Sequence, residues 1–148
     1  MKHLLTIVFA GLLALPTGAA DTAEGPPTLP VMAGDAVDLN EFLWIKRLIV
    51  VFADTPNDPR FVEQMDLLNA DIPAVLTRDL MVITDTDPAA ASDLRRTLRP
   101  RGFAVVLIDK DGGVKLRRPA PSDMRELRRS IDKWPTRQQE IREELGKE

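Results

Sequence analysis

Cysteine and tyrosine are absent from the 148 residues of this sequence, and its single histidine is His3. Without cysteine the chain has no disulfide bond, no thiol nucleophile and no metal site built on thiolates. If the N-terminal segment with His3 is removed, the remaining chain also lacks a histidine base for a catalytic triad. A domain without disulfide bonds must be held together by its core alone.

The N-terminus has the pattern of a secretory signal peptide. A short polar start precedes an apolar run over residues 4–15, and small residues at 18–20 suit a signal peptidase. The apolar run is too short to cross the ~30 Å hydrocarbon core of a bilayer. We therefore predict a signal peptide over residues 1–20, cleaved after Ala20, and a periplasmic or secreted protein. An uncleaved N-terminal anchor is the alternative.

Charge is unevenly distributed along the rest of the chain. Without Lys2, 19 basic and 23 acidic residues remain, which gives a net charge of −4. Residues 21–109 hold 8 basic and 15 acidic side chains, whereas residues 110–142 hold 10 basic and 5 acidic ones. The basic region suits an anionic partner, or else forms an ordinary solvated helix face. Because the protein is predicted to be exported, we expect no nucleic acid among its partners.

The predicted strands follow from three apolar runs. Residues 21–37 contain three prolines and two glycines and are predicted to be an extended leader or linker. Residues 38–46 are predicted to form a short helix or turn. Continuous apolar runs then predict buried strands over residues 47–53, 80–84 and 103–108.

Helix signals separate these strands. Asp58 is the predicted cap of the first helix, and the proline after it suits the first helical position. A second helix is predicted over residues 89–98. The glycines of the turn at 110–113 predict a hairpin with a return strand over 114–117. Ser122 is the predicted cap of the next helix.

The order of these elements predicts the fold class. Strands joined by helices are expected to be parallel neighbours, and the hairpin adds an antiparallel edge. With right-handed crossovers, the result is an α/β, thioredoxin-like three-layer sandwich with a mixed central sheet and a C-terminal hairpin and helix. The predicted domain covers residues 38–142, and a charged tail follows over 143–148.

Three segments resemble one known family. They are DLNEFLWIKRLIVVFA at 38–53, KDGGVKLR at 110–117 and IDKWPTRQQEIRE at 131–143. In this order they are similar to P-DUDES, a secreted domain of unknown function, over roughly residues 38–142. The resemblance implies a fold like that of thioredoxins and peroxiredoxins, and no established reaction.

The resemblance also locates the positions where redox members of this fold hold their cysteines. Counted from Phe52, the two thiol positions fall near Asn57 and Arg60, and neither side chain can attack a disulfide or a peroxide. In redox members a cis-proline directly precedes the third strand and faces the thiol pair. Here Gly102 stands just before that strand, and Pro100 lies slightly earlier. We therefore exclude thiol oxidoreductase and peroxidase activity.

Basic side chains near the hairpin are the candidates for binding. Lys115 and Arg117 alternate onto one face of the return strand. Lysine and arginine on an edge strand also prevent edge-to-edge aggregation. The functional interpretation is a docking patch for a protein or a small anionic ligand. Its candidate residues are Arg47, Lys110, Lys115, Arg117 and Arg137.

Four aspartates lie near the ends of the first two strands, where open α/β sheets bind ligands. They are Asp54, Asp58, Asp85 and Asp87. Their carboxylates are suitable ligands for Ca²⁺, although aspartate before proline and at a helix start is also ordinary turn chemistry. We favour the turn interpretation and predict no metal, no cofactor and no catalytic residue.

These observations favour a non-catalytic binding or interaction module. Two alternatives stay open. One is an enzyme that uses carboxylates, such as a hydrolase, which needs a carboxyl group with a raised pKa in an apolar cleft. The other is a periplasmic stress or chaperone-like protein. Trp44 and Trp134 are predicted to be anchors in or at the rim of the core.

Overall fold

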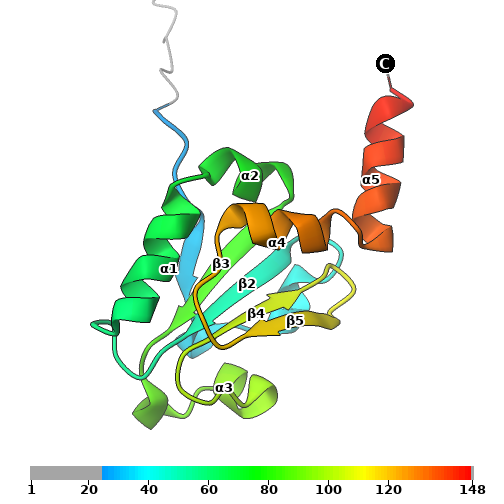
Figure 1. Ribbon diagram of the computed structural model, residues 1–148. Helices are drawn as coiled ribbons and strands as arrows, with labels where there is room; N and C mark the ends of the chain where they lie inside the picture. The colour runs from blue at the N-terminus through cyan, green and yellow to red at the C-terminus, as the bar shows by residue number, and fades with distance from the viewer. Residues whose placement is uncertain (1–24, 148) are drawn as a thin grey trace, which may run out of the picture.

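The computed structural model describes residues 25–147, so the predicted signal peptide lies outside the described residues. A mixed sheet of five strands forms its centre, in the order β1-β3-β2-β4-β5 (Figure 1). The strands are β1 (Val31–Ala33), β2 (Arg47–Phe52), β3 (Leu80–Asp85), β4 (Ala104–Ile108) and β5 (Val114–Arg118). The α-helices are α1 (Pro59–Asn69), α2 (Ile72–Thr77), α3 (Asp93–Leu98), α4 (Met124–Ile131) and α5 (Pro135–Leu145). Short 3-10 helices are η1 (Gly34–Ala36), η2 (Leu39–Phe42) and η3 (Pro88–Ala90).

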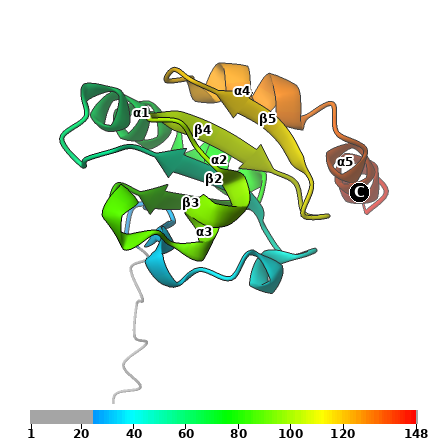
Figure 2. The same cartoon turned by 90° about the horizontal axis from the view of Figure 1, so that it is seen from below.

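The helices form two layers around the sheet (Figure 2). Helices α1, α2 and α4 cover one face, which we call the α1 face. Helix α3 and the segment with η1 and η2 cover the other, which we call the α3 face. Helix α5 lies beside the sheet instead of over it (Figures 1 and 2). The predicted three-layer arrangement with a mixed sheet and a C-terminal hairpin is confirmed.

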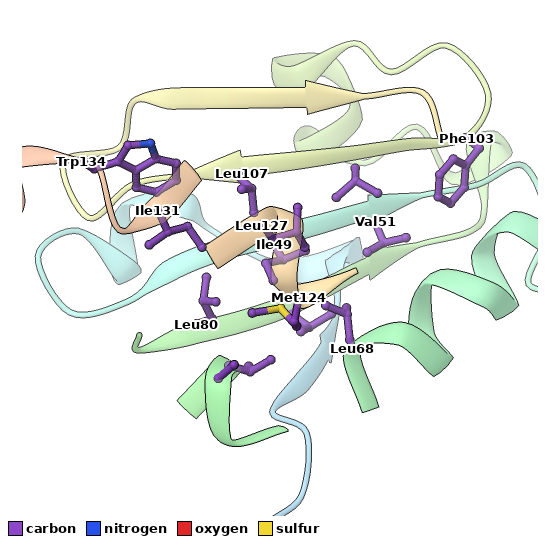
Figure 3. Packing of buried hydrophobic residues seen from close by; sticks show 14 of the residues in the cluster. Ile49, Val51, Leu68, Leu80, Phe103, Leu107, Met124, Leu127, Ile131 and Trp134 are labelled. Carbon is purple, nitrogen blue, oxygen red and sulfur yellow. The ribbon is translucent and has the colours of Figure 1, made fainter. Parts of the chain in front are cut away.

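Strand β2 supplies both halves of the core, because its side chains alternate between the two faces. Ile49 and Val51 pack on the α1 face (Figure 3), whereas Leu48 and Val50 pack on the α3 face. All six residues of β2 are buried, as the apolar run predicted. Trp134 is 9% exposed and closes one end of the α1-face cluster, so the prediction of a core anchor is confirmed for this residue.

The start of α4 differs by one residue from the prediction. Asp123, and not Ser122, caps this helix by accepting a hydrogen bond from the backbone N–H of Glu126 at 2.8 Å. Ser122 is buried against α1, where its N–H and carbonyl bond the side-chain amide of Gln64 at 2.8 and 2.9 Å. This long-range contact fixes the Ser122 backbone and moves the cap to the next residue.

The direction of β4 corrects the expectation that helix-linked strands lie parallel. Strands β1, β3 and β2 are parallel, but β4 is antiparallel to β2. The reason is the length of α3, whose six residues rise only about 9 Å at ~1.5 Å per residue. This helix cannot return the chain to the far end of the sheet, so β4 begins at the end where β3 finished.

The segment before residue 38 also contributes to the sheet. Residues 31–33, expected within a leader or linker, form β1 and pair with β3 in parallel register. At the other end of the chain, α5 extends to Leu145, beyond the predicted boundary at 142. Among the described residues, no helix is long and apolar enough to span a membrane.

Gly34 offers a test of this N-terminal packing. A Cβ atom added there would lie 2.7 Å from Cδ2 of Leu94, which is 1% exposed and has little room to move. We predict that Gly34→Ala lowers the free energy of unfolding by about 1–3 kcal/mol in urea denaturation. The control is Gly25→Ala, whose Cβ would meet nothing within 4 Å. Equal stability of the two variants would contradict the packing of η1 on α3.

Candidate functional site

The turn between β2 and α1, where the thiol positions were predicted, is filled by a helix cap. Asn57 is exposed, and its backbone N–H donates to Oγ1 of Thr55 at 3.3 Å. Asp58 accepts from the backbone N–H of Arg60 at 2.9 Å, which confirms the predicted cap. The side chain of Arg60 bonds Asp58 at 3.0 Å and lies 5.4 Å from the ring centre of Phe103. This hydrogen bond lowers the pKa of Asp58 from its usual range, so an ionised carboxylate of the chain itself occupies the helix end.

The carboxyl ends of β2 and β3 are bridged by Arg95 of α3. Its Nε donates to Oδ1 of Asp85 at 2.8 Å, and its Nη2 donates to the carbonyl oxygen of Ala53 at 2.7 Å. The Ser92 hydroxyl donates to the other oxygen of the Asp85 carboxylate at 2.6 Å. The end of the sheet at which α/β proteins commonly bind ligands is therefore filled by side chains of this chain.

The same contacts account for two of the four aspartates considered as calcium ligands. Asp58 and Asp85 are paired with Arg60 and Arg95 and are not turned toward a shared centre. Over residues 25–147, no group of three or more acidic or histidine side chains is placed to hold a metal ion. The contacts of Asp58 and Asp85 with backbone N–H groups fit the cap and turn interpretation.

A buried ionic network lies at the opposite end of the sheet and centres on Arg47, whose side chain is fully buried. Its Nε donates to Asp109 at 3.0 Å, and its two terminal nitrogens donate to the two carboxylate oxygens of Glu140 at 3.0 and 3.1 Å. Thr136 accepts from Arg47 at 3.0 Å and donates to Asp109 at 2.8 Å. Because Thr136 and Glu140 belong to α5, this network attaches α5 to the sheet.

Two more cations converge on Glu140. Lys110 Nζ lies 2.7 Å from Glu140 and 2.8 Å from Asp79, and Nη1 of Arg137 lies 3.2 Å from Glu140. Burial by itself raises the pKa of Glu140, but hydrogen bonds from Arg47, Lys110 and Arg137 outweigh it and lower this pKa to about 2. Glu140 is therefore an ionised structural group and not a proton donor at neutral pH.

The predicted basic patch is corrected by this network. Arg47, Lys110 and Arg137 do come together, but carboxylates match their charges, and Arg47 and Arg137 are 0% and 5% exposed. Burying guanidinium groups is possible only with such partners. These residues hold the fold together and are not available as a surface for an anionic ligand.

The hairpin residues themselves lie apart from that network. Lys115 is exposed and pairs with Asp111 of the turn at 3.5 Å. Nη1 of Arg117 donates to the carbonyl oxygen of Leu98 at the end of α3, at 2.7 Å. Arg117 thus attaches the hairpin to α3, and strand alternation puts Lys115 on the same face of β5.

A groove of about 590 Å³ opens on the α3 face between η2, α3 and the hairpin. Leu48 of β2, Leu94 of α3 and Ile108 of β4 form an apolar floor, and all three are buried. Phe42 and Leu43 of the η2 segment form a wall. No local sequence signal predicts this groove, because its floor residues are spread over three elements, with Leu48 and Ile108 60 positions apart in the chain.

The rim of the groove is acidic. Asp35, Asp38 and Asp93 line it and are all exposed. Lys46 also lines the groove, and Lys110 does so with its amino group bound to carboxylates. Asp93 is paired with Arg96. Asp35 and Asp38 against Lys46 leave a net negative charge at the rim, which would attract a cation.

Beside this groove lies the Trp44 turn, by which we mean residues 43–45. Trp44 is 69% exposed and Ile45 is 62% exposed, so the prediction that Trp44 anchors the core or its rim is wrong. Trp44 has φ +62°, a backbone conformation that is unusual for a bulky residue. Its N–H donates to the carbonyl oxygen of Lys110 at 2.8 Å, and the N–H groups of Ile45 and Lys46 both reach the carbonyl of Phe42 at 3.0 Å. Hydrogen bonds thus hold an exposed tryptophan in a strained turn.

Solved structures share the fold of this chain. A thioredoxin from Nicotiana alata is 22% identical with a TM-score of 0.51, over 72% of this chain and 96% of that chain. Reduced desulfothioredoxin from Desulfovibrio vulgaris Hildenborough is 17% identical with a TM-score of 0.53, over 71% and 97%. Reduced 2-Cys peroxiredoxin from Plasmodium vivax is 15% identical with a TM-score of 0.50, over 65% and 81%. At these identities the likeness concerns the fold alone, and it confirms the predicted thioredoxin-like fold.

One family also matches the sequence. Residues 38–140 match a family described as "Domain of unknown function (DUF4174)". No curated protein matches the chain. The comparisons therefore assign a fold and a family but no activity.

The ionic network predicts a pH-dependent stability. Because the pKa of Glu140 is about 2 in the folded chain and near 4.5 ordinarily, its contribution is present above pH ~4.5 and is lost as the pH falls toward 2. We predict that Glu140→Gln lowers the free energy of unfolding at pH 7 by about 2–4 kcal/mol and weakens the loss of stability between pH 5 and 2. Urea denaturation across this pH range measures both effects.

The matched control is Glu143→Gln, a substitution on the exposed side of the same helix, where Glu143 bonds only Gln139 among the described residues. Its effect should stay within about 0.5 kcal/mol. If Glu140→Gln unfolded like the wild type at pH 7, the network would not be what attaches α5.

Proposed function

This chain belongs to the DUF4174 family of domains of unknown function, and from that premise we propose that it is an exported, non-catalytic binding module. Its thioredoxin-like fold contains no cysteine, and its former thiol end is closed by Asp58 and Arg95. The pKa values of Asp58 and Glu140 are both lowered, which speaks against a carboxylate acting as general acid at either position. We also propose the relation to P-DUDES domains and export through residues 1–20, on the sequence patterns alone.

The Trp44 turn is the observation that carries the proposal. A left-handed backbone costs a residue with a side chain roughly 1–2 kcal/mol, and an exposed indole adds no burial in the core. Glycine or asparagine would form the same turn at lower cost. A residue that breaks a local rule with no gain in stability is a candidate for function. Tryptophan is also one of the side chains enriched among residues that dominate protein–protein binding energies.

The adjoining groove specifies the partner. Its apolar floor suits an apolar side chain, and the exposed Asp35 and Asp38 at its rim suit a lysine or arginine beside that side chain. We therefore propose that the module docks a segment of another protein that combines basic and apolar residues. Trp44 and Ile45 contact this segment beside the groove.

A library of random peptides displayed on phage tests this specificity. Peptides selected on the wild-type protein should be enriched in lysine, arginine and apolar residues. Their affinity should fall by about thirtyfold in Trp44→Ala, as for a residue that contributes ~2 kcal/mol to binding. Added sodium chloride should weaken binding, because it screens the rim carboxylates. Val62→Ala is the control, since Val62 is an exposed apolar residue on α1.

The proposal would be overturned if selected peptides carried no basic residues, or if they bound Trp44→Ala as tightly as the wild type. A second variant separates function from folding. Trp44→Asn should retain or raise the stability of the wild type, since asparagine tolerates a positive φ, and should lose the peptides. If Trp44→Asn instead destabilised the fold, Trp44 would have a structural role.

A further inference from the structure

A second cleft lies on the α1 face, at the edge of the sheet between β5 and α4. It has a volume of about 460 Å³ and is lined by Arg118, Glu126, Arg129, Ser130, Lys133 and Trp134. None of these residues was a candidate from the hairpin patch, and the cleft is separated from the Trp44 groove by the sheet.

The positions of these side chains follow from the periods of the strand and the helix. Leu116 of β5 packs on the α1-face cluster, so Arg118, two residues later, lies on the same face, while Arg117 lies on the other. In α4, the apolar stripe with Leu127 packs on the sheet. The neighbouring positions 126, 129 and 130 of α4 have helical spacing and line the cleft, and Lys133 joins them from the turn after the helix.

The cations of this cleft lack carboxylate partners. Among residues 25–147, the ion pairs engage other basic residues and none includes Arg118, Arg129 or Lys133. Arg129 lies in the last turn of α4 and Lys133 in the turn that follows the helix, so both positive charges line the same cleft. Three cations against the single carboxylate of Glu126 leave the cleft positive, although the chain as a whole is acidic.

We propose that this cleft binds a phosphate or sulfate monoester carried on a small hydroxylated molecule, such as a sugar. The guanidinium groups of Arg118 and Arg129 suit bidentate contact with the anionic oxygens, and Lys133 adds a point charge. The Ser130 hydroxyl is a further donor. Glu126 accepts a hydrogen bond from a ligand hydroxyl, so the cleft distinguishes an ester of a polyol from the bare anion.

Titration of the purified protein with glucose 6-phosphate, followed by the arginine Nε–H signals in NMR spectra, tests the cleft. We expect saturable binding that is tighter than that of inorganic phosphate and absent for glucose. The double variant Arg118→Gln/Arg129→Gln should weaken glucose 6-phosphate binding by about tenfold or more. The control Arg125→Gln/Arg128→Gln removes the same charge from exposed positions of α4 that do not line the cleft, and it should leave the affinity unchanged.

Three results would overturn the proposal. The first is the absence of saturable binding to glucose 6-phosphate. The second is an equal loss of affinity in the cleft variant and the control variant, which is expected if the protein's positive charges attract the anion without a specific site. The third is equal affinity for glucose 6-phosphate and inorganic phosphate, since Glu126 would then select nothing. Arg129→Gln alone, on an exposed position of α4, keeps the test valid if the double variant does not fold. Vesicles of phosphatidic acid distinguish a lipid from a soluble monoester, and binding to them alone would contradict the proposed soluble ligand.

Discussion

The buried guanidinium of Arg47 is the constraint on which the rest of the structure depends. A charge without access to water must be matched, and its partners come from the hairpin loop and from α5. Asp109 is thereby fixed at the start of the hairpin loop, next to Lys110, whose carbonyl oxygen accepts the N–H of Trp44. The network around Arg47 thus also supports the exposed Trp44 turn. The connection runs through the adjacent residues Asp109, which pairs with Arg47, and Lys110, which accepts the Trp44 N–H.

The sequence patterns predicted the elements better than their long-range relations. The apolar run of β2, the Asp58 cap and the hairpin at 110–113 are local signals, and the structure confirms all three. The direction of β4 depends on the length of α3, which an amphipathic pattern defines poorly. Arginines give no local sign of burial either, because the partners of Arg47 lie 62 and 93 residues away. The basic residues near the hairpin were therefore interpreted as one surface, although the fold divides them.

The two ends of the sheet differ in how their polar groups are satisfied and in what they expose. At the carboxyl ends of β2 and β3, Arg60 and Arg95 satisfy the carboxylates and backbone carbonyls that a ligand would otherwise use. At the other end, the Trp44 turn exposes an apolar side chain that the core does not need. A thioredoxin-like scaffold without thiols keeps the sheet and its layers, and its candidate binding surfaces lie on the groove and the cleft instead.

Site-specific photo-crosslinking in the native host tests this relocation most directly. A photoreactive amino acid is introduced at position 45 in one variant and at position 57 in another, both of which are exposed. We expect discrete protein adducts from position 45, beside Trp44, and none from position 57, in the turn where redox proteins of this fold hold their thiols. Adducts from position 57 together with none from position 45 would contradict it and return the functional surface to the end of the sheet that redox relatives use.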